Sequence, residues 1–470
     1  MSHENKLNQD QQQALRAIKR FLFDPSLNTF ILRGYAGTGK TFLMQHLGKI
    51  LKEKKKAFSF LASTGRAAAV LRGKTGFDAR TVHSELYHFT NVEGDDANIA
   101  SNAPIDAFGQ MKLIFNLRST DEKERLYIVD EASMLASEIS ADTSFAQFGT
   151  GRLLFDFFAS IANNKVIFVG DPCQLPPVQQ LFSPALSQKW IRAQGRSPVT
   201  AQLTDIVRNK ADSGILQLAG HVRSLFTANS LPKWIKLPAY NIPDIKVVAH
   251  LTQLTKQYVD IAAKGNNTNC MAICRSNRDC MLINREVRLI KYGTDDAPLQ
   301  VGDVLMVTQN NYLVALTNGD FVQVLSLGEP RTKANLHFIN IRVKALMQDK
   351  EYEILICLDV LYGTQNNISQ EQHRDLMVDF SRRMSRKGIR ANSAEYKETM
   401  MKDAYLNSLR AVYGYAITCH KAQGGEWNEV YLFLNKGMYS MEQPELLRWW
   451  YTAITRAKEK LYLHADWWII

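Results

Sequence analysis

The sequence predicts an α/β fold with two units that each hold a parallel sheet, a polar insertion in the first unit, and a small β-barrel-like insertion with a helical arm in the second. Short apolar runs alternate with helical periodicity near the N-terminus, and the same alternation returns toward the C-terminus. The region before that return changes to β-like runs. Because the carboxyl ends of parallel strands meet at one edge of a sheet, we expect the functional residues there.

The first unit is expected over residues 1–200. It begins with an amphipathic helix, because Leu15, Ile18 and Leu22 recur at helical spacing. A short apolar strand then runs into a glycine-rich loop, and strands alternate with helices from there. The segments expected as strands are NTFILRG, AFSFLAST, RLYIVDEAS and NKVIFVGDP, and the later helices are TFLMQHLGKILKEKKK and TGRAAAVLRG.

Two insertions interrupt this pattern. Residues 84–125 are polar and rich in turn formers, so they are expected as an insertion in the first unit. Residues 201–310 and 411–470 are expected to form the second unit, with MAICRSN and QVGDVLMV among its strands. Residues 311–410 combine short β-like runs with the charged stretch EQHRDLMVDFSRRMSRKGIR, which predicts an inserted β module with a helical arm.

Composition narrows the class of partner. The chain has 470 residues, 46% of them apolar, and no run of roughly 18 consecutive apolar residues, so no membrane span is expected. The N-terminus lacks an apolar segment behind a basic start, so we expect no secretory signal and a cytoplasmic, nucleoid-associated setting. The net charge of +11 favours a polyanion, because Lys and Arg gain affinity for phosphates by releasing counterions.

The six cysteines are too few and too scattered for a disulfide framework. Only Cys270, Cys274 and Cys280 lie close together, and their spacing matches neither CxxC nor a paired zinc pattern. We therefore expect a half-buried strand that runs into a helix, with a zinc site as the alternative.

A phosphate-binding loop is predicted by RGYAGTGKTF, which satisfies GxxxxGK[ST] between a strand and a helix. Gly37 and Gly39 let the backbone amides approach phosphate oxygens closely. Lys40 adds a positive charge there, and the Thr41 hydroxyl can hold Mg²⁺. The alternative is a glycine turn with an exposed lysine.

Hydrolysis of the bound phosphate needs a metal anchor and a base. The predicted strand RLYIVDEAS ends in an acidic pair. Asp130 would hold Mg²⁺, and Glu131 would polarise the attacking water. An ordinary helix start is the alternative for this acidic pair. The following strand ends in Asp171, and Gln174 beyond it could sense the γ-phosphate or the water.

Two arginines far along the chain are candidates for stabilising the charge that phosphoryl transfer spreads over the γ-oxygens. They are Arg208 in LTDIVRN and Arg456 in YTAITRAKEKL. Taken alone, a surface salt bridge is the better expectation for either one.

The ordered segments resemble the helicase motifs of superfamily 1, in the 1B group of 5′-to-3′ DNA helicases near RecD and phage Dda. The nine segments are LNQDQQQAL, GYAGTGKT, LASTGRAAAVL, ARTVHSELY, IVDEASM, GDPCQLPPV, LTDIVRN, AITCHKAQGGEW and YTAITRAKEKL. Their order makes the resemblance far more specific than any single motif. It implies two RecA-like P-loop domains with ATP and Mg²⁺ between them.

The resemblance also implies a role for each site residue. Gln11 would read adenine, and Gln174, Arg208 and Arg456 would contact the γ-phosphate, with both arginines supplied by the second domain. The catalytic acidic pair would be Asp130 and Glu131, and Thr41 and Asp130 would bind the metal ion. The remaining nucleotide contacts would be Gly37, Thr38, Gly39, Lys40, Thr41, Gly425 and Glu426.

Single-stranded DNA contacts are implied in both domains. They map onto Ser63, Thr64 and His83 in the first domain and onto Thr418, His420, Lys421 and Gln423 in the second. Capping and packing are the alternative, since Ser63 and Thr64 could start a helix. Ser63 also stands where the family usually has proline.

The insertion over residues 84–125 resembles the strand-separating pin of the family. Phe115 is the first candidate for stacking on a base, a contact worth roughly 1–3 kcal/mol per base, and Phe89 is the rival. A core position within the pin is the alternative for either phenylalanine.

The resemblance implies an ATP-dependent helicase that moves 5′-to-3′ on single-stranded DNA and unwinds fork or tailed duplexes. It also implies a monomeric motor that works with replication or recombination proteins. Two alternatives stay open. One is a translocase or annealing motor that does not unwind, and the other is a nucleotide-gated binding module that only holds nucleic acid.

Overall fold

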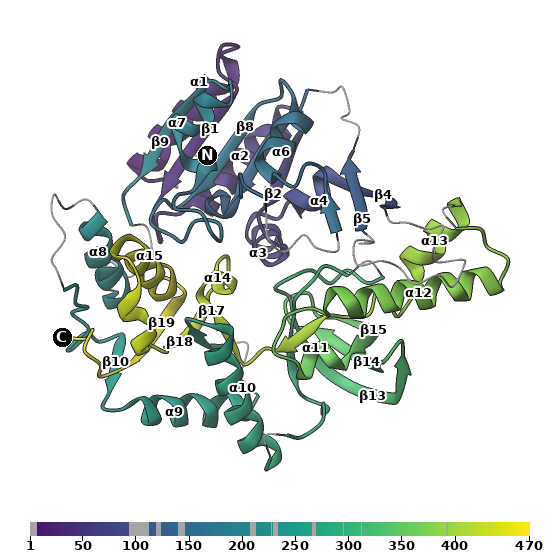
Figure 1. Ribbon diagram of the computed structural model, residues 1–470. Coiled ribbons are helices and arrows are strands. Elements are labelled where there is room, and N and C mark those ends of the chain that lie inside the picture. The colour runs from purple at the N-terminus through teal and green to yellow at the C-terminus, as the bar shows by residue number, and fades with distance from the viewer. Residues whose placement is uncertain are drawn as a thin grey trace.

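The computed structural model of the chain contains two α/β domains and a β-rich module beside the second domain (Figure 1). We call these parts the first domain, the second domain and the β module. The structure describes residues 7–93, 112–118, 124–139, 146–206, 213–226, 228, 234–265, 269–294, 296–311, 313–391 and 393–470.

The first domain is built on a six-stranded parallel sheet in the order β3-β2-β6-β8-β1-β9. All residues of β8 are buried, as expected for a strand covered on both faces. The carboxyl ends of β1 and β8 lie side by side, because Arg33 pairs with Gly170. The strands are β1 (Thr29–Gly34), β2 (Phe58–Ala62), β3 (Ala79–Thr81), β6 (Leu126–Asp130), β8 (Val166–Gly170) and β9 (Pro198–Leu203).

Local caps determine where the helices of this domain begin. Asn8 and Gln11 form a capping box at the start of α1. Gly39 precedes α2 with φ +76°, a left-handed conformation that favours glycine. The helices are α1 (Gln9–Phe23), α2 (Lys40–Glu53), α3 (Gly65–Thr75), α4 (Val82–Leu86), α6 (Leu153–Ile161) and α7 (Gln188–Ala193).

The predicted insertion in the first domain contains part of a separate small sheet. Strand β4 (Tyr87–Glu93) pairs antiparallel with β5 (Lys112–Leu117), and β5 pairs in parallel with β7 (Ala146–Phe148). The segment between β4 and β5 lies outside the described residues. The sheet therefore extends beyond the expected end of the insertion at residue 125, because β7 is its third strand.

The second domain has a five-stranded parallel sheet in the order β10-β19-β18-β11-β17. Together with the first sheet, it confirms the predicted α/β fold with two parallel sheets. Its strands are β10 (Ile245–Val248), β11 (Cys270–Cys274), β17 (Ala416–Thr418), β18 (Trp427–Leu432) and β19 (Ala457–His464). Its helices are α8 (Gly214–Phe226), α9 (Leu251–Ala263), α10 (Asn277–Tyr292), α14 (Cys419–Ala422) and α15 (Gln443–Ile454).

The β module is a five-stranded antiparallel sheet in the order β15-β14-β13-β12-β16, with helices α11, α12 and α13 attached. Its strands are β12 (Val304–Val307), β13 (Phe321–Lys333), β14 (Leu336–Ala345), β15 (Lys350–Cys357) and β16 (Ala411–Tyr413). Its helices are α11 (Leu358–Tyr362), α12 (Gln370–Arg386) and α13 (Ala394–Lys402), and α12 provides the expected helical arm (Figure 1).

The expected domain boundaries need correction at three places. The boundary at residue 200 falls inside β9, which pairs with β1. The run VLMV was assigned to the second domain, yet it is β12 and pairs with β13 and β16 of the β module. The β module therefore extends from about Val304 to Tyr413. An apolar run of four buried residues has no periodicity that distinguishes a parallel from an antiparallel strand.

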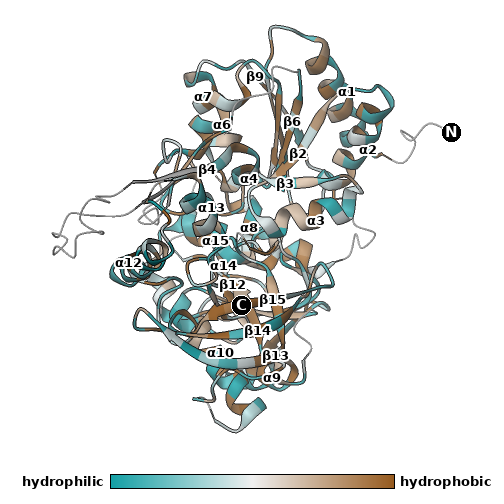
Figure 2. Cartoon of the chain, turned by 90° about the vertical axis from the view of Figure 1, so that its right-hand side faces the viewer, coloured by the Kyte–Doolittle hydropathy of each residue, from teal (hydrophilic) through white to brown (hydrophobic). Residues whose placement is uncertain are grey.

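Hydrophobic residues are frequent in the strands of the first sheet, while the helical arm α12 is largely hydrophilic (Figure 2). Cys270, Cys274 and Cys280 lie on β11 and the start of α10, which confirms the expected strand and helix. The strand is fully buried and not half-buried, because it lies in the interior of the second sheet. In the part of the chain that the structure describes, no helix is both long enough and apolar enough to cross a bilayer.

Candidate active site

The predicted phosphate loop lies between β1 and α2, at the carboxyl edge of the first sheet. Gly37 and Gly39 adopt φ values of +80° and +76°. The Lys40 ammonium donates hydrogen bonds to the carbonyl oxygens of Gly34 at 2.7 Å and Tyr35 at 3.1 Å. A Cβ on Gly34 would lie 2.9 Å from the side chains of Lys40 and Thr38, so this position has no room for one. The loop is thus closely wrapped around the stem of Lys40.

Gln11 connects α1 to this loop. Its side chain is fully buried, and its Nε2 donates to the carbonyl oxygen of Thr38 at 3.1 Å. Its Oε1 accepts from the N–H of Asn8 at 3.2 Å. Gln11 therefore lies beside the loop, as predicted, and its contact with adenine stays a prediction.

The acidic pair lies at the end of β6, facing the loop across the same cleft. Asp130 is 9% exposed, and its Oδ1 accepts from the N–H of Glu131 at 2.9 Å. Burial, followed by the Glu131 carboxylate, raises the pKa of Asp130 to about 7. Glu131 has φ +49°, an uncommon value for a residue with a side chain and one that concentrates at functional sites.

The strand end after β8 supplies two further polar groups. Asp171 is fully buried, and its carboxylate accepts from the N–H of Cys173 at 3.0 Å and from the Tyr451 hydroxyl at 2.8 Å. Gln174 is 3% exposed, and its buried Oε1 has no hydrogen-bond partner among the described residues. Gln174 lines the cleft, so a bound molecule or a water there can donate the hydrogen bond that its Oε1 lacks.

Arg456 enters the cleft from the second domain. It is 5% exposed, and its guanidinium donates to the carbonyl oxygens of Thr452 at 2.9 Å and Gly425 at 3.2 Å, and to the Thr455 hydroxyl at 3.0 Å. None of these acceptors is a carboxylate. Within the described chain, no ion pair neutralises Arg456, so its positive charge remains available to an anion in the cleft.

Glu426 also reaches the cleft from the second domain and pairs with Lys74 of α3 at 3.3 Å, which joins the two domains. The cleft has a volume of about 330 Å³. Its lining residues are Gln11, Ala36, Gly37, Gly39, Lys40, Thr41, Phe42, Ala67, Val70, Lys74, Asp130, Glu131, Gln174, Gly424, Glu426, Thr455 and Arg456. Most of the predicted nucleotide residues therefore converge on it. Arg208 lies outside the described residues.

The donor set of the cleft fits a triphosphate with Mg²⁺. The Thr41 hydroxyl and the Asp130 carboxylate are hard oxygen ligands on one wall, and Mg²⁺ prefers such ligands. Lys40 and Arg456 supply positive charge from opposite domains. A bound cation would also favour the ionised form of Asp130, which burial disfavours.

The residues predicted to bind DNA fall into two groups. Thr64 caps α3, because its hydroxyl accepts from the N–H of Ala67 at 3.1 Å, and the Ser63 hydroxyl contacts the Met134 sulfur at 3.4 Å. Gln423 is 2% exposed and donates to the carbonyl oxygen of Leu175 at 2.9 Å. In this conformation the Gln423 side chain therefore joins the two domains, as the packing alternative expects, and its contact with DNA stays a prediction.

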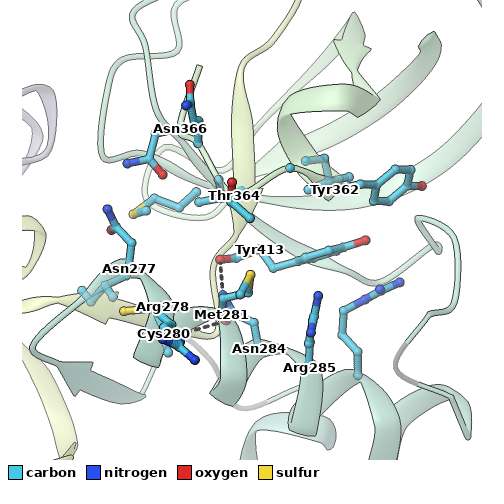
Figure 3. A pocket seen from close by; sticks show the side chains of 18 of the residues that line it. Asn277, Arg278, Cys280, Met281, Asn284, Arg285, Tyr362, Thr364, Asn366 and Tyr413 are labelled. Atoms are coloured by element: carbon cyan, nitrogen blue, oxygen red, sulfur yellow. Dashed lines mark hydrogen bonds between the residues drawn. The ribbon is translucent and has the colours of Figure 1, made fainter. Parts of the chain in front are cut away.

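Thr418 and Lys421 line a second cavity, of about 590 Å³, between α10 and the β module (Figure 3). Arg278 and Arg285 lie on the α10 side of it, seven residues apart on one face of the helix. The predicted DNA contacts do not include these two arginines, although their spacing of seven residues could have indicated a shared helix face. His420 is adjacent to this region, and burial lowers its pKa.

In the pin region, Phe115 occupies the core position that was the alternative to base stacking. Phe115 is 3% exposed and stacks on Phe148 at 4.7 Å, so in this conformation it is a core residue and offers no face to a base. His83 packs against Phe148 at 5.7 Å, and desolvation lowers its pKa to about 4. The position of the Phe89 side chain lies outside what the structure describes. The residues around Phe115 do not indicate that Phe148 of β7, distant in sequence, covers it.

Two interdomain residues were not predicted at all. Arg66 of α3 is 7% exposed and lies over the rings of Trp427 in the second domain at 4.1 Å and Phe321 in the β module at 5.2 Å. Burial, followed by Arg456, lowers its pKa to about 10. Tyr451 contacts the phosphate loop from α15. In the sequence both look like ordinary core or surface positions.

Two family models match the chain. One, described as an AAA domain, covers residues 6–228, and the other, described as a UvrD-like helicase C-terminal domain, covers residues 413–464. The first contains the phosphate loop and the acidic pair, and the second contains Arg456.

Several relatives are similar over most of the chain. The ATP-dependent RecD2 DNA helicase of Deinococcus radiodurans is 23% identical over 92% of this chain and 46% of its own length. The uncharacterized protein R530 of Acanthamoeba polyphaga mimivirus is 20% identical over 97% of this chain and 99% of its own length. A crystal structure of Pif1 helicase from Bacteroides, in complex with ADP-AlF3 and ssDNA, is 15% identical over 99% of this chain and 94% of that one, with a TM-score of 0.49. The chain thus spans about half the length of its RecD2 relative.

Proposed function

We propose that the chain is an ATP-dependent DNA helicase of superfamily 1B, similar to the RecD type. The matched UvrD-like helicase C-terminal domain and the similarity to RecD2 support this proposal. One observation carries the proposal. Lys40 from the first domain and Arg456 from the second line the same cleft, so a triphosphate bound there would contact both domains.

Each cleft residue has a chemical task in this proposal. Lys40 and the loop amides would bind the β- and γ-phosphates. Thr41 and Asp130 would hold Mg²⁺, which when bound would neutralise charge on the phosphate oxygens. Glu131 accepts a proton from the attacking water, and Gln174 orients that water. Arg456 stabilises the charge on the transferred group from the second domain. Arg208 is proposed for the same task.

Movement follows from the position of the nucleotide. Binding of a ligand that contacts both domains favours the closed cleft, and loss of the γ-phosphate removes that preference. If both domains grip single-stranded DNA, through Ser63 and Thr64 on one side and Thr418 and Lys421 on the other, alternating closure produces stepping. We propose that this stepping runs 5′-to-3′ and that the pin opens the duplex ahead of it.

The first test is ATP turnover with and without single-stranded DNA. We expect DNA to raise kcat by at least about tenfold, because a grip on DNA would order the second domain against the phosphate loop. Released phosphate is measured with saturating ATP and Mg²⁺. Turnover that is as fast without nucleic acid as with it would contradict the proposal.

A second candidate function is a single-strand DNA translocase that does not unwind. The burial of Phe115 favours the translocase, because the ring that was expected to stack on a base is packed against Phe148 instead. The two functions share every cleft residue and differ only in whether a duplex ahead of the motor is opened.

A further inference from the structure

Tyr451 lies where the two domains meet behind the cleft. It stands in the last turn of α15 and is 2% exposed. The N–H of Ala36, in the phosphate loop, donates to its hydroxyl oxygen at 2.9 Å. The same hydroxyl donates to Oδ2 of Asp171, at the end of β8, at 2.8 Å. One side chain of the second domain thus contacts two segments of the first.

The chemistry of the groups fixes the direction of both hydrogen bonds. A backbone N–H can only donate, so the phenol oxygen is the acceptor toward Ala36 and its proton is directed to Asp171. Burial raises the pKa of Tyr451 well above its usual value, which keeps the phenol protonated and able to donate. Phenylalanine has neither the acceptor nor the donor.

The residue next to Tyr451 extends the contact to Arg456. The Thr452 hydroxyl accepts from the N–H of Leu175, four residues beyond Asp171, at 2.9 Å. The carbonyl oxygen of Thr452 accepts from Nε of Arg456 at 2.9 Å. The phosphate loop is therefore connected to the arginine in the cleft. Ala36 is hydrogen-bonded to Tyr451, Tyr451 is covalently bonded to Thr452, and Thr452 is hydrogen-bonded to Arg456.

We propose that Tyr451 is a positioning residue that sets Arg456 of the second domain in register with the phosphate loop of the first. The inference rests on the proposed function and adds a residue to it. Without the hydroxyl, the N–H of Ala36 and Oδ2 of Asp171 lose a buried partner, and α15 loses its direct hydrogen bond to the loop. The groups that bind the nucleotide itself stay in place. The loss is therefore expected in turnover and not in ATP affinity.

The test is Tyr451→Phe, which keeps the ring and its packing. We expect kcat for DNA-stimulated ATP hydrolysis to fall by about tenfold or more, while KM for ATP and Kd for single-stranded DNA each change by less than about threefold. The matched control is Tyr258→Phe, which removes a buried hydroxyl that donates to the Tyr415 carbonyl oxygen inside the second domain. The control is expected to lower the melting temperature and to leave kcat within about twofold of the native value.

A double-mutant cycle distinguishes a specific effect on the position of Arg456 from a general loss of stability. If Tyr451 acts through Asp171, then Asp171→Asn combined with Tyr451→Phe costs less than the product of the two single losses. The inference is overturned if Tyr451→Phe retains native kcat, if it changes KM and kcat together, or if Tyr258→Phe lowers kcat equally. If the native chain shows no DNA-stimulated turnover, the proposed function itself fails, and this outcome is distinct from all three.

Discussion

Lys40→Ala is expected to abolish DNA-stimulated ATP hydrolysis, with kcat lower by about a thousandfold or more, equivalent to ~4 kcal/mol of activation free energy. Lys40 is the charged side chain of the phosphate loop itself, and among the described residues its ammonium donates hydrogen bonds only to the carbonyl oxygens of Gly34 and Tyr35. These two oxygens hold the ammonium where the phosphates would lie in the proposed complex. Without it, no other side chain of the loop can neutralise the γ-phosphate.

The fold should survive this change, because Lys40 begins α2 and is only partly buried. Melting temperature and single-stranded DNA affinity are measured beside kcat. The control is Lys52→Ala, at an exposed position near the end of the same helix. Native turnover by Lys40→Ala would reject the assignment of this cleft as the hydrolytic site, whereas a fall in both variants would indicate damage to α2.

Arg456→Ala is expected to lower kcat by about a thousandfold while KM for ATP changes far less, because an arginine supplied from a second domain acts mainly on the charge of the transition state. The structure favours this role. The guanidinium is buried, unpaired with any carboxylate of the described chain, and oriented by Thr452, Gly425 and Thr455 of its own domain.

Arg456→Lys should not restore the activity, since an ammonium cannot reproduce the planar fork that these three acceptors orient. The control is Arg196→Ala in the first domain, where a buried arginine bonds four groups of the protein far from the cleft. It should lower stability and spare kcat. Loss of ATP affinity by Arg456→Ala, with kcat unchanged, would assign the arginine to ground-state binding instead.

The elements that the sequence predicted well are those whose pattern is local. The run before Gly34 forms a strand because its apolar residues are continuous, and Lys40 begins a helix because left-handed Gly39 precedes it. Strand β12 was placed in the wrong domain because its partners, β13 and β16, are set by pairing across a long insertion. Four consecutive apolar residues do not indicate which strands they will pair with.

The same distinction holds in the site. Gln11, Lys40, Asp130 and Arg456 belong to short motifs, and the structure brings all four to one cleft. The interdomain contact of Tyr451 depends on the docking of α15 against the loop, which no residue spacing within α15 encodes. The same holds for Gln423 and Phe115. The sequence leaves a packing role open for both, and the contacts that bury them, with Leu175 and Phe148, are distant in sequence.

The most direct test of the account is strand displacement by the native chain, with ATP and Mg²⁺, from two duplexes that differ only in the polarity of a single-stranded tail. Displacement from the 5′-tailed duplex is predicted to be at least about tenfold faster than from the 3′-tailed duplex, and to require ATP hydrolysis. Displacement that favours the 3′ tail, or that proceeds without ATP, would contradict the account. DNA-stimulated ATP turnover without displacement from either duplex would contradict unwinding and leave the single-strand translocase.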